Sequence, residues 1–189
     1  MVVRQAQKLQ FLIVLFVTVS SFAHADIIYA ATRAGLSISA DGGQHWSNDA
    51  SVLGGVPGNW VSGVHAIDST TFVSTWTNGI LIGGGTVWIG ISSPVISKNV
   101  GSIYAAGNDV YACTLEGLWI STNDGTNWTQ SLAHAVVNRV TTAGHTIYAA
   151  TNGAGLAVSN DGGTSWKSYL GTDGVADVAV SGTTIYVAT

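Results

Sequence analysis

Few side chains of this chain suit catalysis. Outside its repeated turns, the carboxylates of interest are those of Asp49, Glu116, Asp173 and Asp177. Hydrolysis of a glycosidic bond needs two carboxylates that face each other. A glycosidase built on this chain would therefore have to use these residues, with Glu116 favoured as the acid and Asp177 as a second candidate. No other reaction is indicated, because the sequence contains neither a Gly-x-Ser-x-Gly elbow nor a phosphate-binding loop.

Metal and thiol chemistry are not indicated either. The histidines that follow residue 25 lack the spacing typical of a metal site. Cys113 is the only cysteine and lies in the apolar run Val110–Thr114, where we expect a buried thiol that acts as a small hydrophobic side chain rather than a nucleophile. We predict no metal and no cofactor.

The N-terminus has the three parts of a secretory signal peptide. Arg4 and Lys8 form a basic region, an apolar stretch of 12 residues spans 11–22, and Ala23-His24-Ala25 resembles a cleavage site. The stretch is shorter than the roughly 20 residues that cross a bilayer. We therefore predict cleavage after residue 25, a periplasmic or extracellular location, and no transmembrane segment afterwards.

The mature chain would hold residues 26–189, enough for one domain. Loss of two basic residues with the leader moves the formal charge from −4 to −6. An acidic chain is a poor match for a phosphate backbone, so we expect no nucleic-acid partner.

The chain repeats itself with a period of about 40 residues. The segments Ile27–Trp46, Val110–Trp128 and Ile147–Trp166 are similar, and Phe72–Trp88 is a degenerate copy. The final tryptophans of these segments lie 42, 40 and 38 residues apart, a spacing typical of β-propeller blades. The predicted units cover about 26–60, 61–97, 98–135 and 136–174, with a partial unit at 175–189.

Each unit is expected to form four short antiparallel strands. The first strands are predicted at Val61–Ile67, Val100–Ala106, Val137–Ala143 and Val175–Ser181. The fold class is thus all-β, a propeller of about four blades in this chain, either incomplete or completed by another chain. In one alternative, Val175–Ser181 supplies the inner strand that the first blade lacks and closes a four-bladed ring.

Three units contain the turn Ser-x-Asp/Asn-x-Gly-x-x-Trp, which we call the box turn. The Asp or Asn side chain can accept backbone N–H bonds, the glycine can adopt a positive φ, and the indole can pack between sheets. These roles are structural. The residues concerned are Ser39, Asp41, Gly43, Trp46, Ser121, Asn123, Gly125, Trp128, Ser159, Asp161, Gly163 and Trp166.

The box turns resemble the Asp-box, or BNR, repeats of sialidases, xyloglucanases, sortilin-type receptors and photosystem II assembly factors. The resemblance implies that each box turn joins the third and fourth strands of a blade, on the face opposite the ligand site. Sialidases hold the substrate carboxylate with three arginines, whereas the mature chain has only Arg33 and Arg139. A complete sialidase site is therefore excluded within one chain.

Ligand-binding residues are expected on the face away from the box turns. Trp60 and Trp76 are the most suggestive, because exposed indoles stack on sugar rings or anchor protein partners. On the inner strands, Arg139 and Asp177 should approach each other. The main candidates are Trp60, Trp76, Arg33, Glu116, Arg139 and Asp177, with Asn48, Asp49, Asn59, Lys98, Asn99, His134, Asn152 and Asp173 as further loop residues.

These features favour an exported, non-catalytic propeller that binds or scaffolds a protein or carbohydrate ligand. Two alternatives remain open. The chain is a relative of the propeller glycosidases, or it is a fragment whose ring is completed by missing sequence or by a homo-oligomer.

Overall fold

The computed structural model describes residues 17–20, 27–49, 60–84, 87–91, 99–171 and 173–189. All regular secondary structure in these ranges is β-strand, which confirms the predicted fold class. No helix in these ranges is long and apolar enough to cross a membrane.

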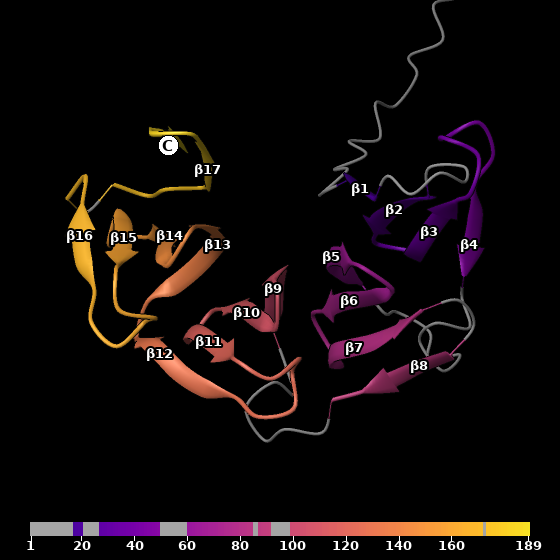
Figure 1. The fold of residues 1–189 in the computed structure, drawn as a ribbon, viewed down its shortest axis with the longest axis horizontal. Coiled ribbons are helices and arrows are strands. Elements are labelled where there is room, and N and C mark those ends of the chain that lie inside the picture. The colour runs from indigo at the N-terminus through magenta and orange to yellow at the C-terminus, as the bar shows by residue number, and fades with distance from the viewer. Residues whose placement is uncertain (1–16, 21–26, 50–59, 85–86, 92–98, 172) are drawn as a thin grey trace, which may run out of the picture.

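The strands form four four-stranded antiparallel sheets and one two-stranded sheet, which follow one another along an arc (Figure 1). In each sheet the strands follow chain order from the inner to the outer side of the arc, so each sheet is one blade of a propeller. The first blade contains β1 (Val17–Ser20), β2 (Ile27–Thr32), β3 (Gly35–Ser39) and β4 (Ser47–Asp49); the second contains β5 (Val61–Ile67), β6 (Thr70–Thr75), β7 (Gly79–Gly84) and β8 (Val87–Gly90). The third contains β9 (Val100–Ala106), β10 (Asp109–Thr114), β11 (Gly117–Ser121) and β12 (Thr129–Ala133); the fourth contains β13 (Val136–Ala143), β14 (Thr146–Asn152), β15 (Leu156–Ser159) and β16 (Lys167–Tyr169); the fifth contains β17 (Asp177–Ser181) and β18 (Thr184–Ala188).

The core lies between blades rather than in one central cluster. In β10, Val110 and Ala112 pack in the cluster shared with the second blade, whereas Tyr111 and Cys113 pack in the cluster shared with the fourth. Successive side chains of a strand point to opposite faces of its sheet. Because a neighbouring blade covers each face of the third blade, both sets of side chains are buried, and the second strand reads as a nearly continuous apolar run.

The box turn of one blade seats against the preceding blade. In the fourth blade, the Trp166 indole N–H donates to Ser131 Oγ of the third blade at 3.0 Å, and the Ser131 hydroxyl donates to the Gly163 carbonyl. Trp128 packs in the same way in the cluster between the second and third blades. Trp46 belongs to the first blade, which has no preceding blade in the described part of the chain, and it is 47% exposed.

The ring is not closed, which contradicts one alternative drawn from the sequence. Val175–Ser181 does not supply the inner strand of the first blade, because β17 within this segment pairs with β18 and β1 holds that inner position. The first and fifth blades lie on opposite sides of a gap in the arc (Figure 1). Strand β17 packs on the fourth blade, where Val175 and Val178 share a cluster with Ala150 and Leu156.

Candidate functional site

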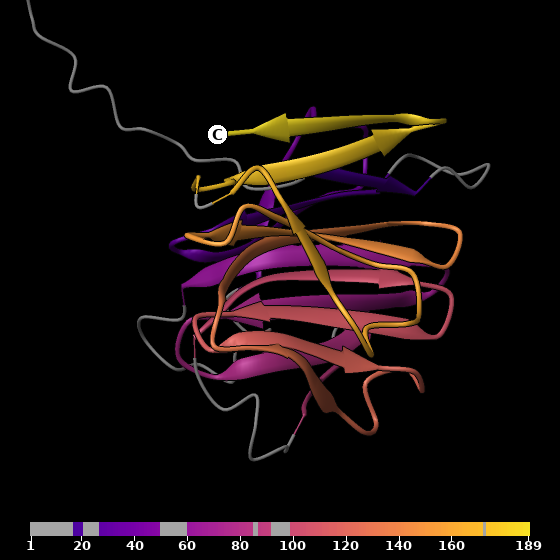
Figure 2. The ribbon, with the colours of Figure 1, turned by 90° about the vertical axis from the view of Figure 1, so that its left-hand side faces the viewer.

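The strands run between two faces of the molecule, and their turns gather on each face (Figure 2). One face carries the box turns, and the other carries the turns that join the second strand of each blade to the third. We call the second face the rim face.

The box turns are saturated with internal hydrogen bonds. Asp161 Oδ1 accepts from the Ser159 hydroxyl at 2.8 Å and from the Ser165 backbone N–H at 2.9 Å. Bonds from Ser165 and Ser159 lower the pKa of Asp161 to about 2. Asp41 makes equivalent bonds, chiefly with His45, and its pKa also falls to about 2. These carboxylates hold their own turns together, as expected of structural residues, and the described residues include no group of three or more His, Cys, Asp or Glu that could hold a metal ion.

In the four blades that have both strands described, a threonine hydroxyl closes the turn between the second strand and the third, a feature that we did not predict. The threonine is the last or, in the fourth blade, the last but one residue of the second strand, and its hydroxyl donates to the carbonyl of a glycine that opens or precedes the third strand. The pairs are Thr32–Gly35, Thr75–Gly79, Thr114–Gly117 and Thr151–Gly155, with donor–acceptor distances of 2.7–3.1 Å. These closed turns could have been predicted from the sequence, because threonine recurs at this place in all four units.

The residue after each threonine starts the exposed part of the turn. In the first and second blades these residues are Arg33 and Trp76, which the sequence analysis selected separately as ligand candidates. The structure brings both to Trp60, the residue before β5.

Trp60 forms the centre of an aromatic patch on the rim face. The Arg33 guanidinium carbon lies 4.5 Å from the centroid of the Trp60 ring, within the range of a cation–π contact. The centroids of Trp60 and Trp76 are 6.0 Å apart, with their planes tilted by 50°. Trp60 remains 41% exposed. We call Arg33, Trp60 and Trp76 the rim patch.

Backbone and packing contacts fix the position of Trp76. Its N–H donates to the Trp60 carbonyl at 3.2 Å, and its carbonyl accepts from the Asn99 N–H at 3.0 Å. A β-carbon at Gly101 would lie 3.8 Å from the six-membered part of the Trp76 ring. The indole therefore lies over the start of β9 in the third blade, and the rim patch spans the junction of three blades.

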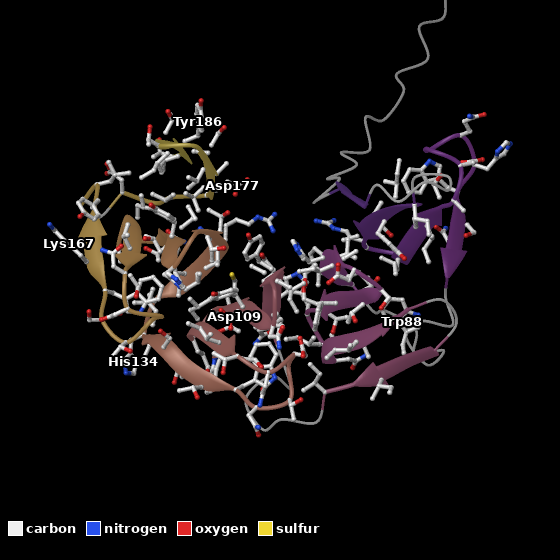
Figure 3. The ribbon with its side chains drawn as sticks, in the orientation of Figure 1. Trp88, Asp109, His134, Lys167, Asp177 and Tyr186 are labelled. Atoms are coloured by element: carbon white, nitrogen blue, oxygen red, sulfur yellow. The ribbon has the colours of Figure 1, made fainter. Side chains whose placement is uncertain are left out.

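The inner strands carry a separate polar group. Arg139 Nη1 donates to Ser102 Oγ at 3.0 Å, and Arg139 Nε lies 3.8 Å from Asp177 Oδ1. The predicted approach of Arg139 and Asp177 is thus present, and Figure 3 shows Asp177 on the inner side of the arc. Burial lowers the pKa of Arg139, whose side chain is only 12% exposed. Arg139 lies in β13 and contacts Ser102 in β9 and Asp177 in β17. It therefore connects the inner strands of three successive blades.

A bulged residue near the start of two inner strands, Ser62 in β5 and Asn138 in β13, also connects neighbouring blades. Asn138 Nδ2 donates to the Val175 carbonyl at 2.7 Å, and the Ser62 hydroxyl donates to the Val100 carbonyl. In both strands the register shifts at this residue, so its side chain is available for the next blade. Neither residue was predicted from the sequence.

The two proposed glycosidase carboxylates are not brought together. Glu116 lies in the turn of the third blade, where its carbonyl accepts from Gln130 and from the His134 backbone N–H. Asp177 is engaged by Arg139 and by the Val178 N–H. Glu116 follows β10 in the third blade and Asp177 opens β17 in the fifth, so the fourth blade lies between them. Asn59, Lys98 and the side chain of Asp49 lie outside the described residues.

Comparison with known proteins identifies the fold but not a family. No family model and no curated protein matches the chain. Among solved structures, YCF48 bound to D1 peptide is 21% identical with a TM-score of 0.60, over 77% of this chain and 51% of that one. The GH74 enzyme of Niastella koreensis is 22% identical with a TM-score of 0.61, over 85% of this chain and 26% of that one. The computationally designed Ika8 protein is 8% identical with a TM-score of 0.66, over 90% of this chain and 54% of that one.

These similarities show a β-propeller, in agreement with the blades described above. The chain spans about half the length of YCF48 and of Ika8, and about a quarter of the GH74 enzyme.

Proposed function

We propose that this chain is an exported, non-catalytic β-propeller module that binds a protein or carbohydrate ligand through the rim patch of Arg33, Trp60 and Trp76. The observation that carries the proposal is the grouping of two indoles and a guanidinium at one exposed junction of blades. Indoles supply large contact areas at low entropic cost, and a guanidinium supplies hydrogen bonds that orient a polar ligand.

Two features support binding rather than catalysis. The rim patch contains no carboxylate, and the two carboxylates proposed for a glycosidase lie on different blades, Glu116 on the third and Asp177 on the fifth. Among similar structures, one is described as bound to a peptide, whereas others are GH74 enzymes. The fold therefore suits both classes of ligand, and the rim patch favours recognition.

Ligand binding can be tested with a glycan array and a library of displayed 12-residue peptides. A ligand that binds the wild-type chain should lose affinity about 30-fold or more on Trp60→Ala, since a central tryptophan contributes about 2 kcal/mol or more to an interface. Trp76→Ala should have a similar effect, and Arg33→Gln should weaken binding of anionic ligands most.

Tyr186→Ala is the matched control, because Tyr186 is an exposed aromatic residue at the other end of the arc (Figure 3). Binding that survives both tryptophan variants would exclude the rim patch as the site. Hydrolysis of an arrayed glycoside that is abolished by Glu116→Gln would contradict the non-catalytic part of the proposal.

Export is tested separately by expression of the full chain in a bacterium that secretes it. Mass spectrometry of the secreted protein should give the mass of residues 26–189. A chain that keeps residues 1–25 would contradict cleavage.

A further inference from the structure

Arg33 is the exposed cation of the rim patch, and its contact with Trp60 leaves hydrogen-bonding capacity for a ligand. A guanidinium carries five N–H donors, and a cation–π contact is an attraction to the ring rather than a hydrogen bond to an acceptor oxygen. In the described part of the chain, the side-chain ion pairs join Asp41 to His45 and Asp177 to Arg139. No carboxylate within the described ranges therefore forms an ion pair with Arg33.

The two turns that carry the rim patch are fixed by hydrogen bonds. In the turn of Arg33, the Thr32 hydroxyl donates to a glycine carbonyl at 2.7 Å and accepts from the Ala34 N–H at 3.1 Å. The Thr75 hydroxyl makes the same two kinds of bond in the turn of Trp76. A ligand therefore meets a surface whose backbone is already ordered, which lowers the entropic cost of binding.

The arrangement of the two indoles suits a peptide better than a sugar. A pyranose ring stacks flat on an open indole face. The Arg33 guanidinium already lies over the ring of Trp60, so stacking from that side would displace it. Trp76 is partly buried against the start of β9 at Gly101. Peptide side chains pack against the edges of aromatic rings as well as against their faces, and the exposed edges of these two indoles remain available to them.

We propose that the rim patch binds an extended peptide segment of a partner protein, in which an Asp or Glu side chain lies two positions from an apolar side chain. The carboxylate accepts hydrogen bonds from the Arg33 guanidinium, and the apolar side chain packs on Trp60 and Trp76. The proposal rests on the function proposed above, of which it names the ligand class.

The separation of two positions follows from the dimensions of the rim patch. Trp60 lies between the Arg33 guanidinium carbon, 4.5 Å from its ring centroid, and the Trp76 ring, 6.0 Å from it. In an extended chain, alternate side chains point to the same side and are about 6.6 Å apart. One of them can thus reach Arg33 while the other contacts the indoles. Consecutive side chains point to opposite sides and cannot do so together.

The charge of the chain limits how acidic the partner segment can be. The formal net charge is −4, so a strongly acidic partner is repelled at long range. A single carboxylate at Arg33 gains a charge-assisted and bidentate contact without that cost. The segment that fits is therefore one acidic residue among apolar and neutral residues.

Peptides selected on the wild-type chain from the displayed 12-residue library supply the probes. A selected peptide with one Asp or Glu is made with blocked ends, together with a neutral version that carries Asn or Gln instead. Fluorescence anisotropy should show that the neutral version binds the wild-type chain about 10-fold or more weakly, because a hydrogen bond to a charged group is lost. Arg33→Gln should weaken the acidic peptide by a similar factor and leave the neutral version unchanged.

Lys167→Gln is the matched control. Lys167 is also an exposed cation over an aromatic ring, with Nζ 5.0 Å from the centroid of Tyr169, but it lies outside the rim patch. Its substitution should change the affinity of neither peptide. Because Arg33 is exposed as well, both variants should fold, and equal Tm values for the two variants would verify this.

The outcomes separate this inference from the proposed function. Peptides that lose affinity on Trp60→Ala, but bind equally well without their acid or to Arg33→Gln, would overturn the role of the carboxylate and leave the proposed function standing. A glycan that binds through Trp60, with no peptide that does so, would overturn the peptide class alone. If no peptide or arrayed glycan bound in a manner dependent on Trp60 or Trp76, both proposals would be overturned.

Discussion

Alanine at Gly163 tests whether the box turns join one blade to the next. Gly163 has a φ of +89°, and a β-carbon there would lie 2.5 Å from Ser131 Oγ and 2.6 Å from Ile120 Cδ1 of the preceding blade. Both atoms would have to move. Ser131 would then lose its hydrogen bonds with the Gly163 carbonyl and the Trp166 indole.

The adjacent Gly162 supplies the matched control. Its φ is +70°, and a β-carbon there would have no neighbour within 4 Å. Both variants should cost about 1–2 kcal/mol for placing a β-carbon in the left-handed region. Only Gly163→Ala should add an overpacking cost of about 1–3 kcal/mol. The expected difference between the two variants is therefore about 1–3 kcal/mol in the free energy of unfolding.

Urea unfolding followed by circular dichroism measures this difference, and thermal unfolding provides a second readout. Each kcal/mol should lower the Tm by about 2–4 °C in a domain of this size. Equal losses of stability in Gly163→Ala and Gly162→Ala would refute the role of the box turn as a joint and leave it a local hairpin device.

Three other expectations follow from the contacts of single side chains. Hydrogen bonds depress the pKa of Asp161 from 3.8 to about 2, so its stabilising contribution should be complete above about pH 4 and be lost as the pH falls towards 2. Asp161→Asn should remove this part of the pH dependence in urea titrations between pH 6 and pH 2, because Asn123 makes the corresponding bonds in its own turn; an unchanged profile would assign the dependence to other groups. The Cys113 thiol is fully buried and its pKa is raised to about 12, so it should react with iodoacetamide at pH 8 only after unfolding, and rapid labelling of the native chain would contradict this burial. Thr151→Val should destabilise the chain by about 1 kcal/mol through loss of the hydroxyl bond to Gly155, while Thr151→Ser should retain that bond; equal losses measured by urea unfolding would assign the effect to packing.

The repeat determines most of the blades because each one is a local meander. The predicted inner strands Val61–Ile67 and Val100–Ala106 coincide with β5 and β9, and Val137–Ala143 lies within β13. The predicted strand at Val175–Ser181 begins two residues later, at Asp177. Turn residues and period-two apolar patterns act over a few residues, so a sequence displays them directly.

Contacts between blades were harder to predict. Trp60 and Trp76 were placed on the correct face, but their contact with each other and with Arg33 depends on how tightly neighbouring sheets pack. The gap between the first and fifth blades also depends on how neighbouring sheets pack. The curvature of the arc is the sum of small angles set by the clusters between blades. Strand β1 was not predicted because its residues lie in the segment that we predict to be the apolar region of a leader.

The threonine that closes each rim turn separates closure of the turn from the choice of the residue that follows it. Its hydroxyl anchors the turn to a glycine carbonyl, so closure of the turn does not depend on the side chain of the next residue. That residue is arginine in the first blade, tryptophan in the second, leucine in the third and asparagine in the fourth. A substitution at Arg33, Trp76, Leu115 or Asn152 leaves this closing hydrogen bond in place, so these four positions suit a library of variants selected for new binding specificities.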